Sequence, residues 1–282
     1  MKRPPTLSPG SRLGVCAPSA CFDIEKLNLG IQILEKLGFK VKVPEEIFGK
    51  KRYLAGDDIA RANVINRLFL DPDIDGIICA RGGFGAIRTL DHLNWNIIKE
   101  NPKPFIGFSD NTAILLSIIG ETGNVVIHGP TVVSLANAQK ATIDAFYKTL
   151  TGCFDKIDMS NARIIKAGKC IGVLKGGNMA TISHLLGTRF QPDFKESVLF
   201  FEDIGEPAYK IDRMLTQMKM AGLFEGIRGV IIGSFENCDN DEYVEEILSE
   251  IFEEYNVPVL SGLDSGHGKV NLSLCMGIRI KM

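Results

Sequence analysis

The sequence lacks a secretion signal, a long apolar run and a concentration of positive charge. The N-terminal residues MKRPPTLSPG are basic, but no apolar stretch follows them, so we predict no signal peptide. No apolar run reaches the roughly 18–20 residues that a membrane-spanning helix needs. The 282 residues carry a formal net charge of -2 without a dense Lys/Arg cluster, which argues against nucleic-acid binding. These absences predict a cytoplasmic protein whose partners are neither membranes nor nucleic acids.

Motifs for disulfide frameworks and metal sites are also missing. The seven cysteines are odd in number, and the one close pair, Cys16 and Cys21, lacks C-x-x-C spacing. Several cysteines stand in apolar runs such as GVCAP and IICA, which is typical of reduced core thiols. The four histidines are far apart, and no H-E-x-x-H motif occurs. We therefore expect no metal and no cofactor.

The first half of the chain alternates strand and helix patterns. Strands are predicted at 12–17, 39–43, 75–80 and 104–108, and helices at 23–37, 57–70 and 110–119. This alternation indicates an α/β fold with a parallel sheet. Ligands of such sheets bind beyond the carboxyl ends of the strands, so the loops 81–85 and 107–112 should share one rim.

The second half differs, because a mixed polar stretch begins near Thr149. We predict an N-terminal domain over residues 1–150 and a second domain over residues 151–282. The second half is expected to contain strands at 163–166, 169–174, 197–201, 228–233 and 276–280, and helices at 177–186, 207–221 and 241–255.

The segment GFSDN carries the clearest local signal for catalysis. Ser109 stands between a predicted strand and a predicted helix, where a sharp turn would lift its hydroxyl clear of the backbone. A helix N-terminus also favours the negative charge that develops during acyl transfer. The α/β-hydrolase elbow is G-x-S-x-G, and here Asn111 replaces its second glycine. A plain helix N-cap serine is the alternative interpretation.

The loop RGGFG is the second signal. Its glycines, Gly82, Gly83 and Gly85, let the backbone approach a ligand closely. The loop could cradle a phosphate or supply an amide to an oxyanion hole. It lacks the lysine of a P-loop and the complete G-x-G-x-x-G spacing, and an ordinary tight turn would also account for it.

A serine nucleophile needs a histidine base and a carboxylate that orients it. His128 follows an apolar strand, and His267 lies between glycines in SGHGK, so both remain candidates for the base. Glu202 and Asp203 end the apolar run VLFF, where either could serve as the carboxylate or as a simple strand-end cap.

Several segments together resemble the LD-carboxypeptidase family, which includes the microcin-immunity peptidases. The matching segments are GVCAPS, ARGGFGAIRTLDHL, PFIGFSDNTAI, HGP, LKGGNM, FEDIGEPAYKIDRML and SGHGKVNLSLCMG. They occur in order over nearly the whole chain, and the ordered set is far more specific than any one of them.

The resemblance implies a serine peptidase with a Ser–Glu–His triad. Its serine corresponds to Ser109, its glutamate to Glu202 and its histidine to His267. The oxyanion donors would be the backbone amides of Gly83 and Asp110. The family's fold is an N-terminal α/β domain joined to a smaller, β-rich and barrel-like C-terminal domain, and its members are usually homodimers.

The implied substrate is a peptide with a terminal D-amino acid. The form of the ARGGFGAIRTLDHL segment favours cytosolic murein tetrapeptide, cleaved before its terminal D-Ala during cell-wall recycling. Arg81, Lys175 and Lys269 are candidates to bind the substrate carboxylate, and His128 is expected beside the substrate. Hydrolysis of peptidyl-nucleotide conjugates is one alternative. A non-catalytic nucleotide- or sugar-binding module that uses the RGGFG loop is the other.

Overall fold

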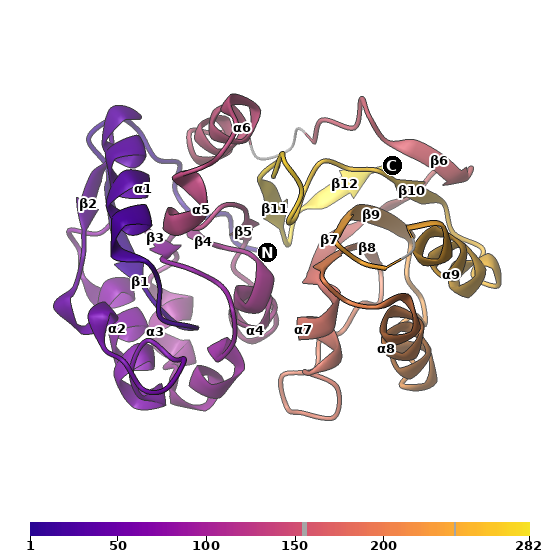
Figure 1. Cartoon of the computed structure of the whole chain (residues 1–282), viewed down its shortest axis with the longest axis horizontal. Helices are drawn as coiled ribbons and strands as arrows, with labels where there is room; N and C mark the ends of the chain where they lie inside the picture. Colours follow the sequence, from indigo (N-terminus) through magenta and orange to yellow (C-terminus); the bar gives the residue numbers. More distant parts are fainter. Residues whose placement is uncertain (154–156, 240) are drawn as a thin grey trace.

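Two six-stranded sheets, each with its own helices, form the molecule (Figure 1). The computed structural model describes residues 1–153, 157–239 and 241–282. The strand order is β11-β5-β4-β3-β1-β2 in the first sheet and β12-β7-β8-β9-β10-β6 in the second. The α/β class expected from the sequence is confirmed.

The first sheet is parallel over five strands. It contains β1 (Arg12–Cys16), β2 (Lys40–Lys42), β3 (Gly76–Cys79), β4 (Phe105–Gly107), β5 (Val126–His128) and, antiparallel to β5, β11 (Leu274–Met276). Its helices are α1 (Ile24–Lys36), α2 (Asp58–Leu70), α3 (Trp95–Glu100), α4 (Thr112–Thr122), α5 (Val132–Leu135) and α6 (Lys140–Leu150). Three 3-10 turns, η1 (Glu45–Phe48), η2 (Ala86–His92) and η3 (Ser109–Asn111), lie between them.

Local sequence explains where these elements begin and end. Asp23 caps α1 by accepting hydrogen bonds from the amides of Glu25 and Lys26. Gly123 ends α4 in the left-handed conformation with φ 70°. Nearly every residue of α4 is buried, because this apolar helix lies against β4 and β5 on one side and contacts β7 and α7 of the second half on the other.

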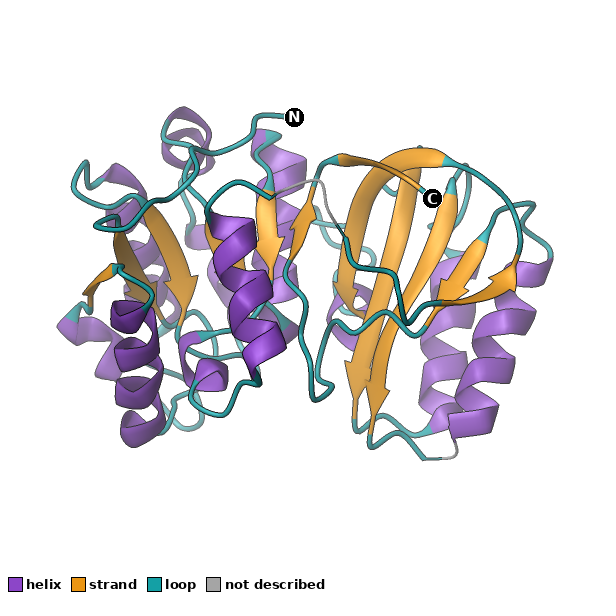
Figure 2. Cartoon of the chain, turned by 90° about the horizontal axis from the view of Figure 1, so that it is seen from above, coloured by secondary structure: helices purple, strands orange, loops and turns teal. Residues whose placement is uncertain are grey.

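The second sheet curls into a half-barrel (Figure 2). It contains β6 (Arg163–Lys166), β7 (Ile171–Asn178), β8 (Ser197–Ile204), β9 (Gly229–Glu236), β10 (Val259–Ser261) and β12 (Arg279–Lys281). The strands β7 to β10 pair in parallel, whereas β6 and β12 are antiparallel edges. The helices of this half are α7 (Met179–Ser183), α8 (Ala208–Met220) and α9 (Asp241–Glu253), of which α8 and α9 pack side by side (Figure 1).

The end of the chain joins the two sheets. After β10 in the second sheet, the chain returns to the first sheet as β11 and then goes back to the second as β12. The single strand expected over 276–280 is therefore two short strands, and Gly277, with φ 95°, breaks them apart. The division expected near residue 150 places β11 in the second domain by sequence, although its strand partner is β5.

Other boundaries differ modestly from the sequence prediction. The helix expected at 177–186 is the short α7, because β7 continues to Asn178. Strand β10 was not expected. Among the described residues, no helix combines the length and the apolarity that crossing a bilayer requires.

Candidate active site

Ser109 lies on a strained turn at the carboxyl end of β4. Its φ is 61°, in the left-handed region that residues other than glycine rarely adopt. The residue follows β4 closely and begins η3, which leads directly into α4. The strand–turn–helix position expected from the sequence is therefore present. Backbone strain of this kind at a serine is typical of a nucleophile elbow.

Asn111 explains why the turn does not follow the glycine pattern. Its side-chain amide donates to the carbonyl oxygens of Phe108 at 3.0 Å and Arg81 at 3.3 Å. Its side-chain oxygen accepts a hydrogen bond from the Ser19 hydroxyl at 3.2 Å. This fully buried side chain thus holds the serine turn against two neighbouring segments. The sequence showed only a missing glycine, because Ser19 and Arg81, two of the three partners of Asn111, are far away in the chain.

The RGGFG loop lies directly against Ser109. A Cβ atom on Gly82 would come within 2.9 Å of Ser109 Cβ and 3.0 Å of Ser109 Oγ, so only glycine fits there without a shift. Gly83 needs its glycine freedom because its φ is 108°. The end of the loop is tied to the serine turn, since the Ala86 amide donates to Asp110 Oδ2 at 2.8 Å.

Backbone amides are available beside Ser109. Asp110 lies in the first turn of η3, and the first amides of a helix have no acceptor within that helix. Gly83 belongs to the adjacent loop, where its backbone is exposed. Both amides belong to segments that border the Ser109 turn, one in η3 and one in the loop that Gly82 brings against Ser109.

Glu202 and His267 form a close pair on the other side of the site. Nδ1 of His267 lies 2.6 Å from Oε2 of Glu202, which is fully buried in β8. Gly266 permits this approach, since a Cβ there would lie 2.6 Å from the same carboxylate oxygen. Burial alone lowers the pKa of His267, but the hydrogen bond and charge of Glu202 outweigh it and raise that pKa above 6.5.

The imidazole of His267 lies beside the serine turn. Its ring centroid is 4.9 Å from that of Phe108, the residue before Ser109. In the described part of the chain, Ser109 Oγ makes no hydrogen bond to His267. Such bonds are often long in free enzymes and tighten when the substrate binds. The turn and the Glu–His pair thus meet through Phe108, although they come from different sheets.

His128 takes a different position. It has no exposed surface, and its ring packs edge-on against Phe108 and Phe200, with centroid separations of 6.0 and 5.1 Å. Among the described residues neither ring nitrogen has a hydrogen-bond partner. Burial lowers the pKa of His128 to about 4, so the ring is neutral. His128 was expected beside the substrate, but its side chain has no exposed surface through which it could contact one. Of the two histidines, His267 is the one paired with a carboxylate.

Asp203 has the capping role that the sequence had also allowed for Glu202. Its carboxylate accepts hydrogen bonds from the Asn178 side chain and the Ala180 amide, both at 2.8 Å, at the start of α7. Burial raises the pKa of Asp203 to about 6, and the charge of Glu202 adds to this rise. The two neighbouring acids therefore point to different partners.

Two of the three cationic side chains expected to bind the substrate carboxylate, those of Arg81 and Lys175, donate to backbone carbonyls. Arg81 is exposed and donates to the Cys21 carbonyl at 2.8 Å. Lys175 is half-buried and donates to the Asp193 carbonyl at 2.6 Å, and its burial lowers its pKa. Lys269 is exposed, two residues after His267. Over residues 1–153, 157–239 and 241–282, no cluster of three His, Cys, Asp or Glu side chains could hold a metal ion.

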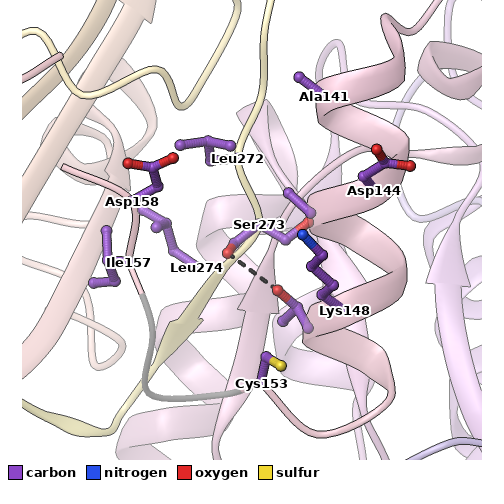
Figure 3. A pocket seen from close by; sticks show the side chains of 11 residues that line it. Ala141, Asp144, Lys148, Cys153, Ile157, Asp158, Leu272, Ser273 and Leu274 are labelled. Carbon is purple, nitrogen blue, oxygen red and sulfur yellow. Dashed lines mark hydrogen bonds between the residues drawn. The ribbon is translucent and has the colours of Figure 1, made fainter. Parts of the chain in front are cut away.

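A separate pocket lies between α6 and the segment before β11 (Figure 3). Asp144 and Lys148 of α6 line one side, and the chain at 272–274 lines the other. The hydroxyl of Thr149 donates to the Ser273 carbonyl across it at 3.4 Å. The lining does not include Ser109, Glu202 or His267.

Family models match both halves of the chain. An LD-carboxypeptidase N-terminal domain matches residues 13–129, and an LD-carboxypeptidase C-terminal domain matches residues 171–282. The chain belongs to the LD-carboxypeptidase family. This membership makes it a serine-type carboxypeptidase, and therefore a hydrolase. It also argues against a non-catalytic binding module.

Individual relatives agree over almost the full length. The LD-carboxypeptidase chain is 33% identical to a probable murein peptide carboxypeptidase of Bacillus subtilis, covering 99% of this chain and 91% of the relative. It is 30% identical to the murein tetrapeptide carboxypeptidase of Pseudomonas aeruginosa, over 92% and 89% of the two chains. The crystal structure of an MccF-like protein from Bacillus anthracis superposes with a TM-score of 0.91 at 25% identity, covering 100% of this chain and 95% of the other.

Proposed function

We propose that Ser109, His267 and Glu202 form the catalytic triad of a carboxypeptidase that removes a terminal D-amino acid. The observation that carries the proposal is the 2.6 Å pair of His267 with fully buried Glu202, placed beside the strained Ser109 turn. A carboxylate in this position selects the tautomer with its proton on Nδ1, which leaves Nε2 free to accept a proton.

The chemistry then follows in two steps. Neutral His267 takes the proton of Ser109, and Oγ attacks the carbonyl carbon before the terminal D-residue. The amides of Gly83 and Asp110 donate to the oxyanion, an interaction worth about 3 kcal/mol per donor. His267 returns the proton to the leaving amine, and the C–N bond breaks to give an acyl-enzyme. Water, deprotonated by His267, then hydrolyses the ester and frees Ser109.

The substrate is proposed to be murein tetrapeptide, which loses its terminal D-Ala. Relatives named as murein peptide and murein tetrapeptide carboxypeptidases support this choice. Arg81 and Lys175 are the proposed ligands of the free carboxylate. The backbone of Arg81 borders the serine turn, because its carbonyl accepts a hydrogen bond from the Asn111 side chain.

The family resemblance extends the proposal to the organisation of the protein. We infer domains over residues 1–150 and 151–282, with the nucleophile on the first and the other triad members on the second. We also infer a homodimer that acts in the cytoplasm during cell-wall recycling.

Hydrolysis of peptidyl-nucleotide conjugates is the second candidate function. The likeness to MccF structures favours it, because solved structures of MccF at 25% identity to this chain are complexes with glutamyl sulfamoyl guanosine or aspartyl sulfamoyl adenosine. The same triad would cleave both murein tetrapeptide and a peptidyl-nucleotide conjugate. The two candidate functions therefore differ only in which chemical groups flank the cleaved bond.

Mass spectrometry of products separates these functions. The purified protein is incubated with L-Ala-D-Glu-meso-diaminopimelate-D-Ala, with the same peptide ending in L-Ala, and with an aspartyl-sulfamoyl nucleoside. Loss of one residue from the D-Ala peptide alone is the expected result. Cleavage of the sulfamoyl nucleoside alone would replace the murein proposal with the second candidate. No cleavage of any of the three would contradict both.

A further inference from the structure

Arg61 is an arginine in the interior of the first half, on the second turn of α2. Only 3% of its surface is exposed. Its side chain is 1% exposed, and the guanidinium pairs with Asp58, one turn earlier, through an Nη2–Oδ1 contact of 2.5 Å. A buried charge without a partner costs several kcal/mol, so this pair makes the position tolerable without explaining why an arginine is there.

The other amino group of Arg61 is directed at the active-site loops. Its Nη1 donates to the Gly85 carbonyl at 2.9 Å and also to the Pro18 carbonyl. Gly85 is the last glycine of RGGFG, with φ 125°, and Pro18 leads into the segment that packs on Gly83. One guanidinium therefore joins the RGGFG loop to the neighbouring chain segment that begins at Pro18.

The space around this contact is filled. A Cβ on Gly85 would lie 2.4 Å from a methyl group of Leu54 and 3.1 Å from Arg61 Nη1. A Cβ on Gly83 would lie 2.7 Å from Ala20 Cβ. The loop can therefore shift little toward Leu54 or Ala20. The orientation of its peptide groups then depends on the hydrogen bonds that its carbonyls accept.

Three groups anchor the loop at two points. Asn111 holds the Arg81 carbonyl at its start, while Arg61 and Asp110 hold the carbonyl and the N–H of a single peptide group, Gly85–Ala86, at its end. The Gly83 amide lies between these two points. Its own peptide group is also held, because the Gly82 carbonyl accepts a hydrogen bond from the Ala20 amide at 3.4 Å. Ala20 stands two residues after Pro18, whose carbonyl Arg61 binds, so Arg61 holds both the end of the loop and the segment that fixes the Gly83 amide.

We propose that Arg61 is a positioning residue that aims the Gly83 amide at the oxyanion. The inference rests on the proposed function, because it assigns a purpose to the Gly83 amide. A lysine could keep the positive charge beside Asp58. It could not hold two carbonyls and a carboxylate in the planar, forked geometry of a guanidinium.

The test compares Arg61→Lys with wild type and with Arg67→Lys, a matched change on the same helix. Arg67 is exposed and pairs with Glu46 at 2.6 Å, far from the loop contacts. Two readouts are measured: kcat and KM for release of D-Ala from the tetrapeptide, and the rate at which a fluorophosphonate labels Ser109. The second readout depends on the serine and the oxyanion hole but not on peptide recognition.

Arg61→Lys should lower kcat and the labelling rate about 10- to 100-fold, since misplacement by about 1 Å costs on the order of a hundredfold. Its KM should stay within about twofold of wild type, as expected when an interaction made only in the transition state is lost. Arg67→Lys should match wild type in every readout. If Arg61→Lys does not fold, Asp58→Asn takes its place, because it removes the partner that orients the guanidinium; its kcat should fall and its KM should not.

Wild-type kcat and labelling in Arg61→Lys, or a raised KM with unchanged kcat, would overturn the positioning role while leaving the proposed function intact. A wild type that neither cleaves the peptide nor reacts with the fluorophosphonate would refute the proposed function, and this inference with it.

Discussion

The contact between Gly82 and Ser109 gives the sharpest structural prediction. The backbone of Gly82 lies outside the positive-φ region, so alanine is allowed there and the effect of Gly82→Ala is purely steric. Its new methyl group would lie 2.9 Å from Ser109 Cβ and 3.0 Å from Ser109 Oγ. Carbon atoms pack at about 3.5–4.0 Å, so the loop or the serine must move by roughly 0.6–1 Å. A displacement of that size lowers the rate by on the order of a hundredfold.

The assay is kcat/KM for D-Ala release together with the fluorophosphonate labelling rate. Gly120→Ala is the matched control, because it adds the same methyl group to α4 at a position where no atom lies within 4 Å apart from the adjacent residues and the backbone of the helix itself. It should keep full activity and raise the free energy of unfolding by about 0.5–1 kcal/mol, since alanine favours a helix interior over glycine. A Gly82→Ala variant with wild-type values in both assays would refute the account of how the loop meets the serine.

Three further predictions concern the buried groups. Glu202→Gln should lower kcat about 10³-fold with little change in KM, because the imidazolium loses its stabilising charge; equal rates would contradict the role of Glu202. In wild type, kcat/KM should fall as the pH drops through the pKa of His267, which lies above 6.5, because the base must be neutral. Glu202→Gln should shift this acidic fall of kcat/KM to lower pH, because the charge of Glu202 raises the pKa of His267. An acidic fall at the same pH in the variant would mean that a group other than His267 is titrating. His128→Phe should flatten the acid dependence of stability measured by urea unfolding. The pKa of His128 is about 4 in the folded protein and 6.5 in the unfolded chain, so between these pH values the unfolded chain binds a proton that the folded protein does not. The free energy of unfolding of wild type should therefore fall by about 3 kcal/mol as the pH drops from 6.5 to 4. An equally steep fall in His128→Phe would contradict the buried, neutral state of His128.

The elements and the serine turn could be predicted because they rest on local patterns. Alternating apolar runs and helix caps place seven elements within a few residues, namely β1, α1, β2, α2, β3, β4 and α4, and the junction of β4 with η3 marks Ser109. Glu202 and His267 were identified as a pair only through the family resemblance, because their contact joins positions 65 residues apart in the sequence. Without the resemblance, His128 and His267 remained equal candidates for the catalytic base. The structure distinguishes them by burial, because His128 has no exposed surface.

The rest depended on tertiary contacts that no local pattern encodes. An arginine on α2 looks like part of a solvated face, yet Arg61 is buried against two carbonyls. Asn111 looked like a defect in a motif, and two of its three hydrogen bonds appear only when Ser19 and Arg81 are brought beside it by the fold. The return of β11 to the first sheet was likewise invisible, since three apolar residues have no periodicity to interpret.

The central claim is that Ser109 performs the attack that releases a terminal D-residue. The most direct test follows release of D-Ala from L-Ala-D-Glu-meso-diaminopimelate-D-Ala by wild type and by Ser109→Ala at equal, high enzyme concentration. The account predicts release by wild type and a rate at least about 10³-fold lower for Ser109→Ala, since only the oxyanion hole and binding remain. Release by Ser109→Ala at the wild-type rate would contradict it.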